Sequence, residues 1–171
     1  MKKLSLSLFS LLIFFSFPAT SICSENIISG KAKIIDGDTI KINKEKIRLD
    51  GIDAPEKKQT CKKIYLSFLI FNFQKDYKCG EESTLALSKK LKDKKVKCIL
   101  KNSKDKYKRS IGTCYIKNEN INGWLVKNGY ALAYKKYSGK YIFEEQFARE
   151  NKLGLWRGTF MKPEKWRRIM N

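Results

Sequence analysis

Short runs rich in isoleucine and separated by turn residues limit this chain to a fold built around small antiparallel strands. Residues 29–35, 39–43 and 46–52 predict three such strands, and the Asp-Gly and Asn-Lys-Glu segments between them favour a meander. Residues 96–100 and 110–116 alternate between apolar and polar side chains and predict two more strands. Five short strands of this kind favour a small closed barrel.

Helical signals lie between and after the strands. Two acidic residues begin the segment 81–94, where they suit the positive end of a helix dipole. Residues 121–128 predict a short helix, and residues 141–152 a longer one with Phe143 and Phe147 on one face. The predicted fold class is therefore α+β with a mainly β core: a five-stranded OB-fold β-barrel with about three helices.

The first residues resemble a secretory signal rather than part of this fold. A short basic head precedes an apolar run over residues 4–17, and small residues follow it. The run is too short to span a bilayer comfortably, although an uncleaved anchor is the alternative. We expect a signal peptide over residues 1–23 and one domain over residues 24–171, secreted or periplasmic.

The chain is strongly basic. Its formal net charge is +20, and loss of Lys2 and Lys3 with the signal lowers it to +18. An excess of this size indicates a polyanionic partner, either nucleic acid or an anionic surface. A lysine bias in an AT-rich genome is the alternative, so the charge suggests a class of partner without proving it.

Four cysteines lie within the predicted domain: Cys61, Cys79, Cys98 and Cys114. An even number in an exported protein indicates two disulfides, for which three pairings are possible. Their order favours Cys61 with Cys79, and Cys98 with Cys114 on two paired strands. A zinc site is disfavoured because the spacings contain no C-x-x-C element and the chain has no histidine.

The absence of histidine also restricts the chemistry. Any hydrolysis must use carboxylates, arginines and a metal ion. Residues 36–39, 48–56 and 105–109 together supply carboxylates for a hard cation and two arginines for a phosphate. This set is what metal-assisted cleavage of a phosphodiester requires.

With these motifs, the chain resembles the staphylococcal nuclease (thermonuclease) family from about residue 33 to residue 156. The matching segments occur in order: Ile35–Thr39, Arg48, Ile52–Glu56, Asp105–Arg109, Asn128–Gly129, Ala133–Tyr134 and Gly154–Trp156. The resemblance implies a five-stranded OB-fold barrel. It also implies a calcium-dependent phosphodiesterase that acts on DNA and RNA and leaves 3′-phosphates.

The resemblance also assigns roles to particular residues. Asp38 and Asp53 would provide carboxylate ligands for Ca²⁺, and the backbone carbonyl of Thr39 would provide a third oxygen, as suits a cation that keeps waters in a flexible geometry. Arg48 and Arg109 would stabilise the negative charge that develops on the phosphate, because a guanidinium donates two parallel hydrogen bonds.

Glu56 matches the glutamate that the family uses near the attacking water. A carboxylate is a weak base at neutral pH, so Glu56 either accepts a proton or orients the water. Asp36 and Asp50 are further acids close to the site, and we do not count them as ligands.

Four residues are candidates for binding the substrate. Lys106 and Tyr107 resemble the pair that contacts a terminal phosphate of a bound nucleotide, while Tyr134 or Tyr137 offers a stacking platform for a base. The alternative is that these tyrosines belong to the core.

The main departure from the family is the apolar segment 64–73, which lies between Cys61 and Cys79. A lid, a membrane-touching patch and a partner site are all possible roles for such a segment. We expect an irregular loop that packs on the barrel and is tied by a disulfide.

The predicted function is a secreted, calcium-dependent endonuclease of DNA and RNA, monomeric and without a stable protein partner. One alternative is a nucleic-acid-binding module on the same fold that has lost catalysis. A third hypothesis is a basic membrane-associated protein that uses residues 64–73. Retention of the full set of acids and arginines argues against a pure binding module.

Overall fold

The computed structural model describes residues 26–136 and 138–170. The predicted signal segment, residues 1–23, and Tyr137 lie outside the described residues. Among the described residues, no helix is long and apolar enough to cross a membrane.

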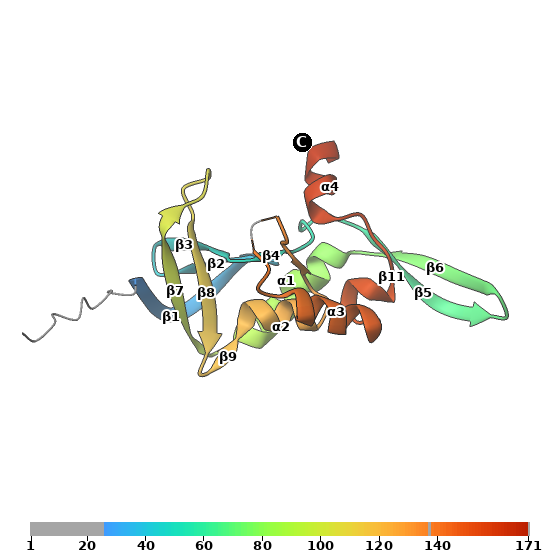
Figure 1. Ribbon diagram of the computed structural model, residues 1–171, viewed down its shortest axis with the longest axis horizontal. Coiled ribbons are helices and arrows are strands. Elements are labelled where there is room, and N and C mark those ends of the chain that lie inside the picture. Colours follow the sequence, from blue (N-terminus) through green and yellow to red (C-terminus); the bar gives the residue numbers. More distant parts are fainter. Residues whose placement is uncertain (1–25, 137, 171) are drawn as a thin grey trace, which may run out of the picture.

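A closed barrel of five strands forms one end of the molecule (Figure 1). The strands follow the order β3-β2-β1-β7-β8, and a parallel pairing of β3 with β8 closes the barrel, with Arg48 opposite Ile111. This architecture confirms the predicted OB-type barrel. The bounds are β1 (Asn26–Asp36), β2 (Thr39–Ile42), β3 (Glu45–Leu49), β7 (Lys95–Lys104), β8 (Ser110–Ile116) and the short β9 (Glu119–Asn120), which pairs antiparallel with the end of β8.

Isoleucine and leucine side chains from β2 and β3 fill the barrel. Ile40, Ile42 and Ile47 are fully buried and Leu49 is almost so, and β-branched residues suit a pleated, packed surface. Burial of each such side chain contributes roughly 1.5–3 kcal/mol. Cys98 and Cys114 form a disulfide inside this core, from directly opposed positions on β7 and β8, so the second predicted pairing is confirmed.

Helices gather beside the barrel, between it and a long hairpin (Figure 1). The segment α1 packs Leu87 and Leu91 into the core, and Asn120 caps α2 by accepting a hydrogen bond from the Gly123 amide at 3.0 Å. Three helices match the expectation, and α4 is an addition that the sequence analysis did not foresee. The bounds are α1 (Cys79–Leu91), α2 (Ile121–Lys127), α3 (Ile142–Glu150), the 3₁₀ turn η1 (Gly154–Arg157) and α4 (Pro163–Met170).

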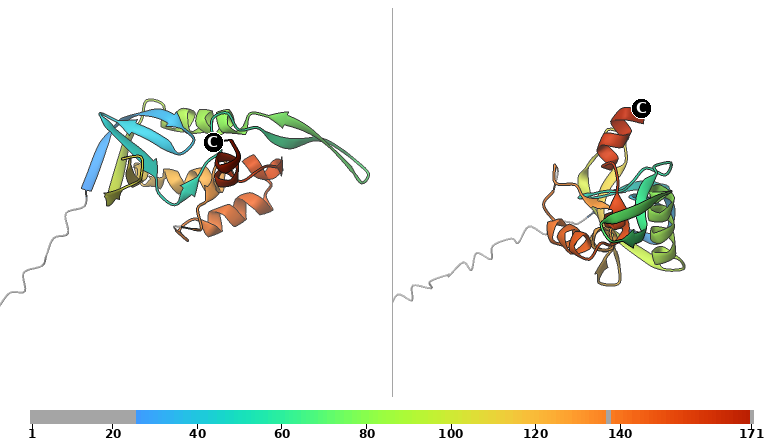
Figure 2. Two further views of the ribbon diagram at one scale, coloured as in Figure 1. Left: turned by 90° about the horizontal axis from the view of Figure 1, so that it is seen from above. Right: turned by 90° about the vertical axis from the view of Figure 1, so that its right-hand side faces the viewer.

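The segment between Cys61 and Cys79 is a regular hairpin, made of β5 (Cys61–Phe68) and β6 (Phe71–Tyr77). It extends well away from the helices and the barrel (Figure 2). The expectation of an irregular loop packed on the barrel was therefore wrong. The strand-forming residues pair with each other around a two-residue turn instead of reaching the core.

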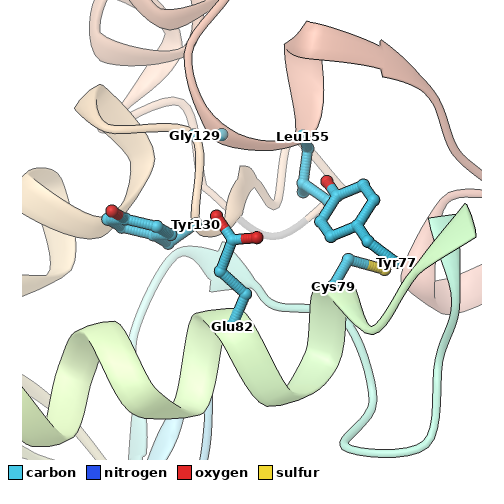
Figure 3. A pocket seen from close by; sticks show the side chains of 7 residues that line it. Tyr77, Cys79, Glu82, Gly129, Tyr130 and Leu155 are labelled. Atoms are coloured by element: carbon cyan, nitrogen blue, oxygen red, sulfur yellow. The ribbon is translucent and has the colours of Figure 1, made fainter. Parts of the chain in front are cut away.

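The base of the hairpin is fixed to the domain. A disulfide joins Cys61 to Cys79, as predicted, and β11 (Gly158–Thr159) pairs with Lys62 and Lys63. Figure 3 shows Tyr77 beside Leu155 and close to Glu82 of α1, around a small hollow. Arg157 lies over the Tyr77 ring and donates a hydrogen bond to Glu82 at 2.5 Å. The hollow contains none of the predicted catalytic residues, so we interpret it as part of the hairpin's anchor.

Candidate active site

Two buried carboxylates share one arginine at the edge of the barrel. Asp38 lies in the turn before β2, Arg48 on β3, and Asp53 on β4 (Ile52–Asp53), which pairs with β10 (Leu132–Ala133). The Arg48 guanidinium forms an ion pair with Asp38 and a second with Asp53 at 3.2 Å. The backbone supports this geometry, because the Leu49 amide donates to the Asp38 carbonyl at 2.8 Å. The barrel thus brings together three residues that were predicted to act together.

Both carboxylates are removed from water. Asp38 is 7% exposed and Asp53 is 3% exposed. Burial raises the pKa of Asp53 above its ordinary value, although Arg167 and Arg48 act in the opposite direction. A buried acid whose charge is costly has a reason to bind a cation.

Asp36 adds a third acid to this corner. Its carboxylate accepts a hydrogen bond from the Asp38 amide at 3.0 Å. Burial, followed by the negative charge of Asp38, raises the pKa of Asp36 to about 6. Asp36 therefore lies close enough to Asp38 to affect it, which agrees with a supporting position beside the proposed ligands.

The second arginine reaches the same corner from the start of β8, the strand that pairs with β3. Arg109 follows the β7–β8 loop, where the Asp105 carboxylate accepts hydrogen bonds from the Tyr107 and Arg109 amides, both at 2.9 Å, and from the Arg109 guanidinium at 2.8 Å. Burial would raise the pKa of Asp105, but its contacts with Arg109 outweigh that effect and hold the pKa below its ordinary value.

Thr39 joins the two arginines. Its hydroxyl accepts a hydrogen bond from Arg109 at 3.0 Å and donates one to Asp38 at 3.1 Å. Arg48, Asp38, Thr39 and Arg109 therefore form one connected polar network. In such a network each side chain restricts the position of the next.

Arg167 is a residue of this corner that the sequence analysis missed. It lies on α4 and donates hydrogen bonds to Asp53 and Glu56, each at 2.8 Å. Burial would lower the pKa of Arg167, but these two carboxylates raise it above its ordinary value. No local pattern identifies Arg167, because it lies more than a hundred residues from both partners. An arginine on a short basic helix near the chain end was the one available signal.

Gln59 was also missed, and it links Glu56 to the segment before α4. Its side chain is fully buried; it accepts a hydrogen bond from the Glu56 amide at 3.3 Å and donates one to the Met161 carbonyl at 2.7 Å. The backbone amide of Gln59 also donates a hydrogen bond to the backbone carbonyl of Glu56 at 2.7 Å. A fully buried amide with these partners fixes the Glu56 turn relative to α4.

The predicted substrate-binding residues lie in two places. Lys106 and Tyr107 are on the loop that carries Arg109; Tyr107 is 65% exposed, and the Arg109 guanidinium lies over its ring at 5.3 Å. Tyr134 follows β10, and its amide donates to the Gly51 carbonyl at 2.9 Å, next to the strand that ends in Asp53.

The donor set fits a hard cation such as Ca²⁺. Asp38 and Asp53 offer carboxylate oxygens, and Ca²⁺ accepts such oxygens together with backbone carbonyls and water. Among residues 26–136 and 138–170, no group of three or more His, Cys, Asp or Glu side chains is arranged to hold a metal. Substrate, backbone and water oxygens would therefore complete the coordination.

A barrel of this topology brings buried acids that suit a hard cation and two arginines that suit a phosphate to one edge. Residues 46–158 match the family model described as staphylococcal nuclease homologue, and the chain belongs to that family.

Two of the three similar proteins reported next carry nuclease names. The chain is 35% identical over 133 residues to the succinoglycan biosynthesis protein ExoI of Rhizobium meliloti (strain 1021), covering 76% of this chain and 65% of that protein. It is 35% identical over 161 residues to an uncharacterized endonuclease of Haemophilus influenzae, covering 89% and 80%. It is 34% identical over 134 residues to a probable staphylococcal-like nuclease, CAN2, of Oryza sativa subsp. japonica, covering 77% and 31%.

Proposed function

We propose that this protein is an exported, calcium-dependent endonuclease that hydrolyses the phosphodiester bonds of DNA and RNA and leaves 3′-phosphates. Membership of the family and the endonuclease-named relatives indicate a nuclease that acts on nucleic acid. The observation that carries the finer proposal is the connected network in which Arg48 binds Asp38 and Asp53 while Thr39 links it to Arg109.

In this proposal, the acids hold the metal and the arginines hold the phosphate. Asp38, Asp53 and the Thr39 backbone carbonyl bind Ca²⁺, which when bound supplies positive charge to the substrate oxygens. Arg48 and Arg109 donate hydrogen bonds to the oxygens on which negative charge develops, where fixed donors have their largest effect on rate. Arg48 is prepared for this role because its ion pairs already fix its orientation.

Glu56 orients or deprotonates the water that attacks the phosphorus. Its carboxylate is held by Arg167, and its backbone by Gln59. These contacts favour orientation, because they hold the Glu56 carboxylate and its backbone in one position.

The nucleic acid extends from this corner over two surfaces. Lys106 and Tyr107 contact a terminal phosphate from the Arg109 loop, and Tyr134 or Tyr137 stacks on a base. The net charge of +20 favours such binding to any polyanion through release of counterions. Two disulfides in the described domain suit an exported protein.

The test is cleavage of single-stranded DNA in calcium and in chelator by the parent chain and by Arg48→Ala, Arg109→Ala and the control Arg149→Ala. We expect cleavage in calcium, none in chelator, 3′-phosphate ends, and a loss on the order of 10²–10³-fold in each of the first two variants. Arg149 lies on α3 over the Trp156 ring, and its removal should leave the rate unchanged.

Two results would overturn the proposal. Cleavage that continues in chelator would exclude the metal's role, and full activity in Arg48→Ala and Arg109→Ala would exclude the arginines. DNA binding without cleavage in any divalent metal would instead support a binding module that has lost catalysis.

A further inference from the structure

The β5–β6 hairpin exposes an unusual amount of apolar surface. Leu69 and Ile70 in its turn are 86% and 87% exposed, and Phe68 and Phe71 beside them are 64% and 60% exposed. A soluble domain rarely presents a contiguous group of large apolar side chains without a binding role. We call the segment 64–73 the apolar tip.

The apolar tip has one apolar face and one polar face. Leu66 is opposite Phe73 and Phe68 is opposite Phe71, so these four side chains lie on one face of the hairpin. Ser67 and Asn72 pair on the other face, where the Ser67 hydroxyl donates to the Asn72 side chain at 2.8 Å. The hairpin is therefore amphipathic across its faces, with Leu69 and Ile70 at the end.

Positive charge surrounds the base of this apolar surface. Residues 57–78 contain six lysines and one acid, Asp76. Lys63 and Lys75 face each other across the strands, and each lies over a tyrosine ring, Tyr77 and Tyr65 respectively. Apolar side chains at a tip with lysines and tyrosine behind them match the layers of an anionic bilayer, in which acyl chains lie beneath negative headgroups.

The backbone limits how deeply the hairpin can enter. The five residue steps from Ile64 to Leu69 span about 17 Å, more than the roughly 5–10 Å that interfacial elements bury. Within the described residues, β11 covers β5 only at Lys62 and Lys63, which leaves the strand edges of the tip unpaired. Unpaired amides and carbonyls are costly in hydrocarbon, so the hairpin must remain in the interface.

From these observations, we propose that the β5–β6 hairpin is a membrane-docking element that inserts its apolar tip into the interface of an anionic lipid bilayer. Lysines at the hairpin base bind the headgroups. The hairpin extends along the long axis of the molecule, away from the β7–β8 end that carries Arg109 (Figure 1). A docked protein therefore keeps that end of its candidate active site away from the lipid.

The test measures sedimentation of the purified chain with vesicles of phosphatidylcholine alone and of phosphatidylcholine mixed with phosphatidylglycerol. The main variant is Leu69→Gly with Ile70→Asn. The φ of Leu69 is positive, at 51 degrees, and Gly followed by Asn suits a two-residue hairpin turn with positive φ at its first position. This variant removes the two most exposed apolar side chains and preserves the hairpin.

We expect the parent chain to bind the mixed vesicles and the main variant to bind them at least about tenfold more weakly. Lys63→Gln with Lys75→Gln should weaken binding to the mixed vesicles and leave binding to vesicles of phosphatidylcholine unchanged. The control, Lys41→Gln with Lys46→Gln, removes an equal charge from a facing pair on β2 and β3 and should bind as the parent does. Cleavage of soluble DNA should be equal in the parent and the main variant.

Insertion has its own readout. Ile70→Trp places a fluorophore at the tip, and brominated acyl chains should quench it more strongly than they quench the tryptophans of the parent chain. Equal vesicle binding by the parent and the main variant would overturn the proposal, as would an absence of additional quenching in Ile70→Trp. A parent chain that does not bind vesicles but forms a dimer, when the main variant does not dimerise, would overturn the proposal in favour of self-association through the apolar tip.

Discussion

The active-site corner and the β5–β6 hairpin are neighbours in the sequence, and they reverse the usual distribution of side chains in opposite ways. At the corner, carboxylates are buried beside partly buried arginines: Asp53 is 3% exposed. On the hairpin, large apolar residues are exposed, up to 87% at Ile70. Folded proteins ordinarily place these two kinds of residue the other way round.

The buried charges of the corner and the exposed apolar side chains of the hairpin differ in the partners that the fold gives them. The buried charges are stabilised by partners, because Arg48, Arg109 and Arg167 each contact at least one carboxylate or its neighbour. The exposed apolar side chains of the tip have no such compensation in the described chain beyond their contacts with one another. The charged side chains of the corner are thus paired within the fold, whereas in our proposal the apolar tip finds its partner in a lipid bilayer.

The largest expected effect is on the free energy of unfolding and concerns the two disulfides. One lies in the barrel and the other at the base of the hairpin. Their sequence separations are 16 and 18, so chain entropy alone predicts similar losses of about 3 kcal/mol. Both pairs are buried, but Cys98 and Cys114 lie in the large barrel core and Cys61 and Cys79 in a small cluster at the hairpin base. We therefore expect the larger cavity cost, and a total of roughly 4–5 kcal/mol, for Cys98→Ala with Cys114→Ala. Urea unfolding of both double variants measures the difference, and a larger loss for Cys61→Ala with Cys79→Ala would contradict the comparison.

The next effect concerns the shape of the Arg48 side chain. Arg48→Lys keeps the charge but loses the planar fork that reaches Asp38 and Asp53 together. We expect single-turnover cleavage to fall on the order of 10²-fold, because a lysine presents a point charge to the phosphate. Thermal unfolding checks that the variant is folded. An unchanged rate would show that charge alone suffices.

A smaller effect concerns Asp50, whose carboxylate binds Lys101 at 2.7 Å and Lys140 at 3.1 Å. Burial would raise the pKa of Asp50, but the two lysines outweigh it and lower the pKa. A lowered folded-state pKa means that this stabilisation is present above the unfolded value of about 3.9 and is lost as the pH falls through the folded value.

Asp50→Asn should therefore cost about 1 kcal/mol at pH 7, since both lysines are about half exposed, and the difference from the parent should vanish in acid. Urea unfolding across the pH range measures it. Asp76→Asn is the matched change on the exposed hairpin and should have little effect at any pH. A difference for Asp50→Asn that grew on acidification would refute the assignment.

The smallest effect concerns Arg167, which shares Asp53 with Arg48. Arg167→Gln removes a positive charge beside the proposed metal ligands, so we expect calcium to bind about threefold more tightly by calorimetry. Arg168→Gln is the control, because Arg168 lies 3.8 Å from Glu164 and contacts neither site acid. Weaker calcium binding in Arg167→Gln would mean that Arg167 holds Asp53 in position instead.

Local patterns predicted much of the barrel and of the corner. The alternation of residues 110–116 matched β8 residue for residue, and the Asp-Gly turn after Asp36 led into β2 as expected. Asp38, Arg48 and Asp53 lie within sixteen residues of one another, so two short strands and their turns were enough to bring them together. The disulfide pairing was predictable because the four cysteines of the domain bond as consecutive pairs along the chain.

Long-range packing explains what the sequence did not reveal. Arg167 and Gln59 reach their partners across more than a hundred residues, and no periodicity encodes such a contact. The segment 64–73 was expected to form an irregular loop that packs on the barrel, yet hydrophobicity does not specify where a segment packs. Its base is fixed by β11 and Cys79, and both direct it away from the core.

In our proposal, Asp38 and Asp53 hold the metal ion on which cleavage depends. The most direct test is the rate of single-stranded DNA cleavage as a function of calcium concentration, for the parent chain and for Asp53→Asn. We expect a saturable calcium dependence in the parent chain and, in the folded variant, a rate reduced at every concentration with saturation shifted to higher calcium. The same calcium dependence in both proteins would contradict it.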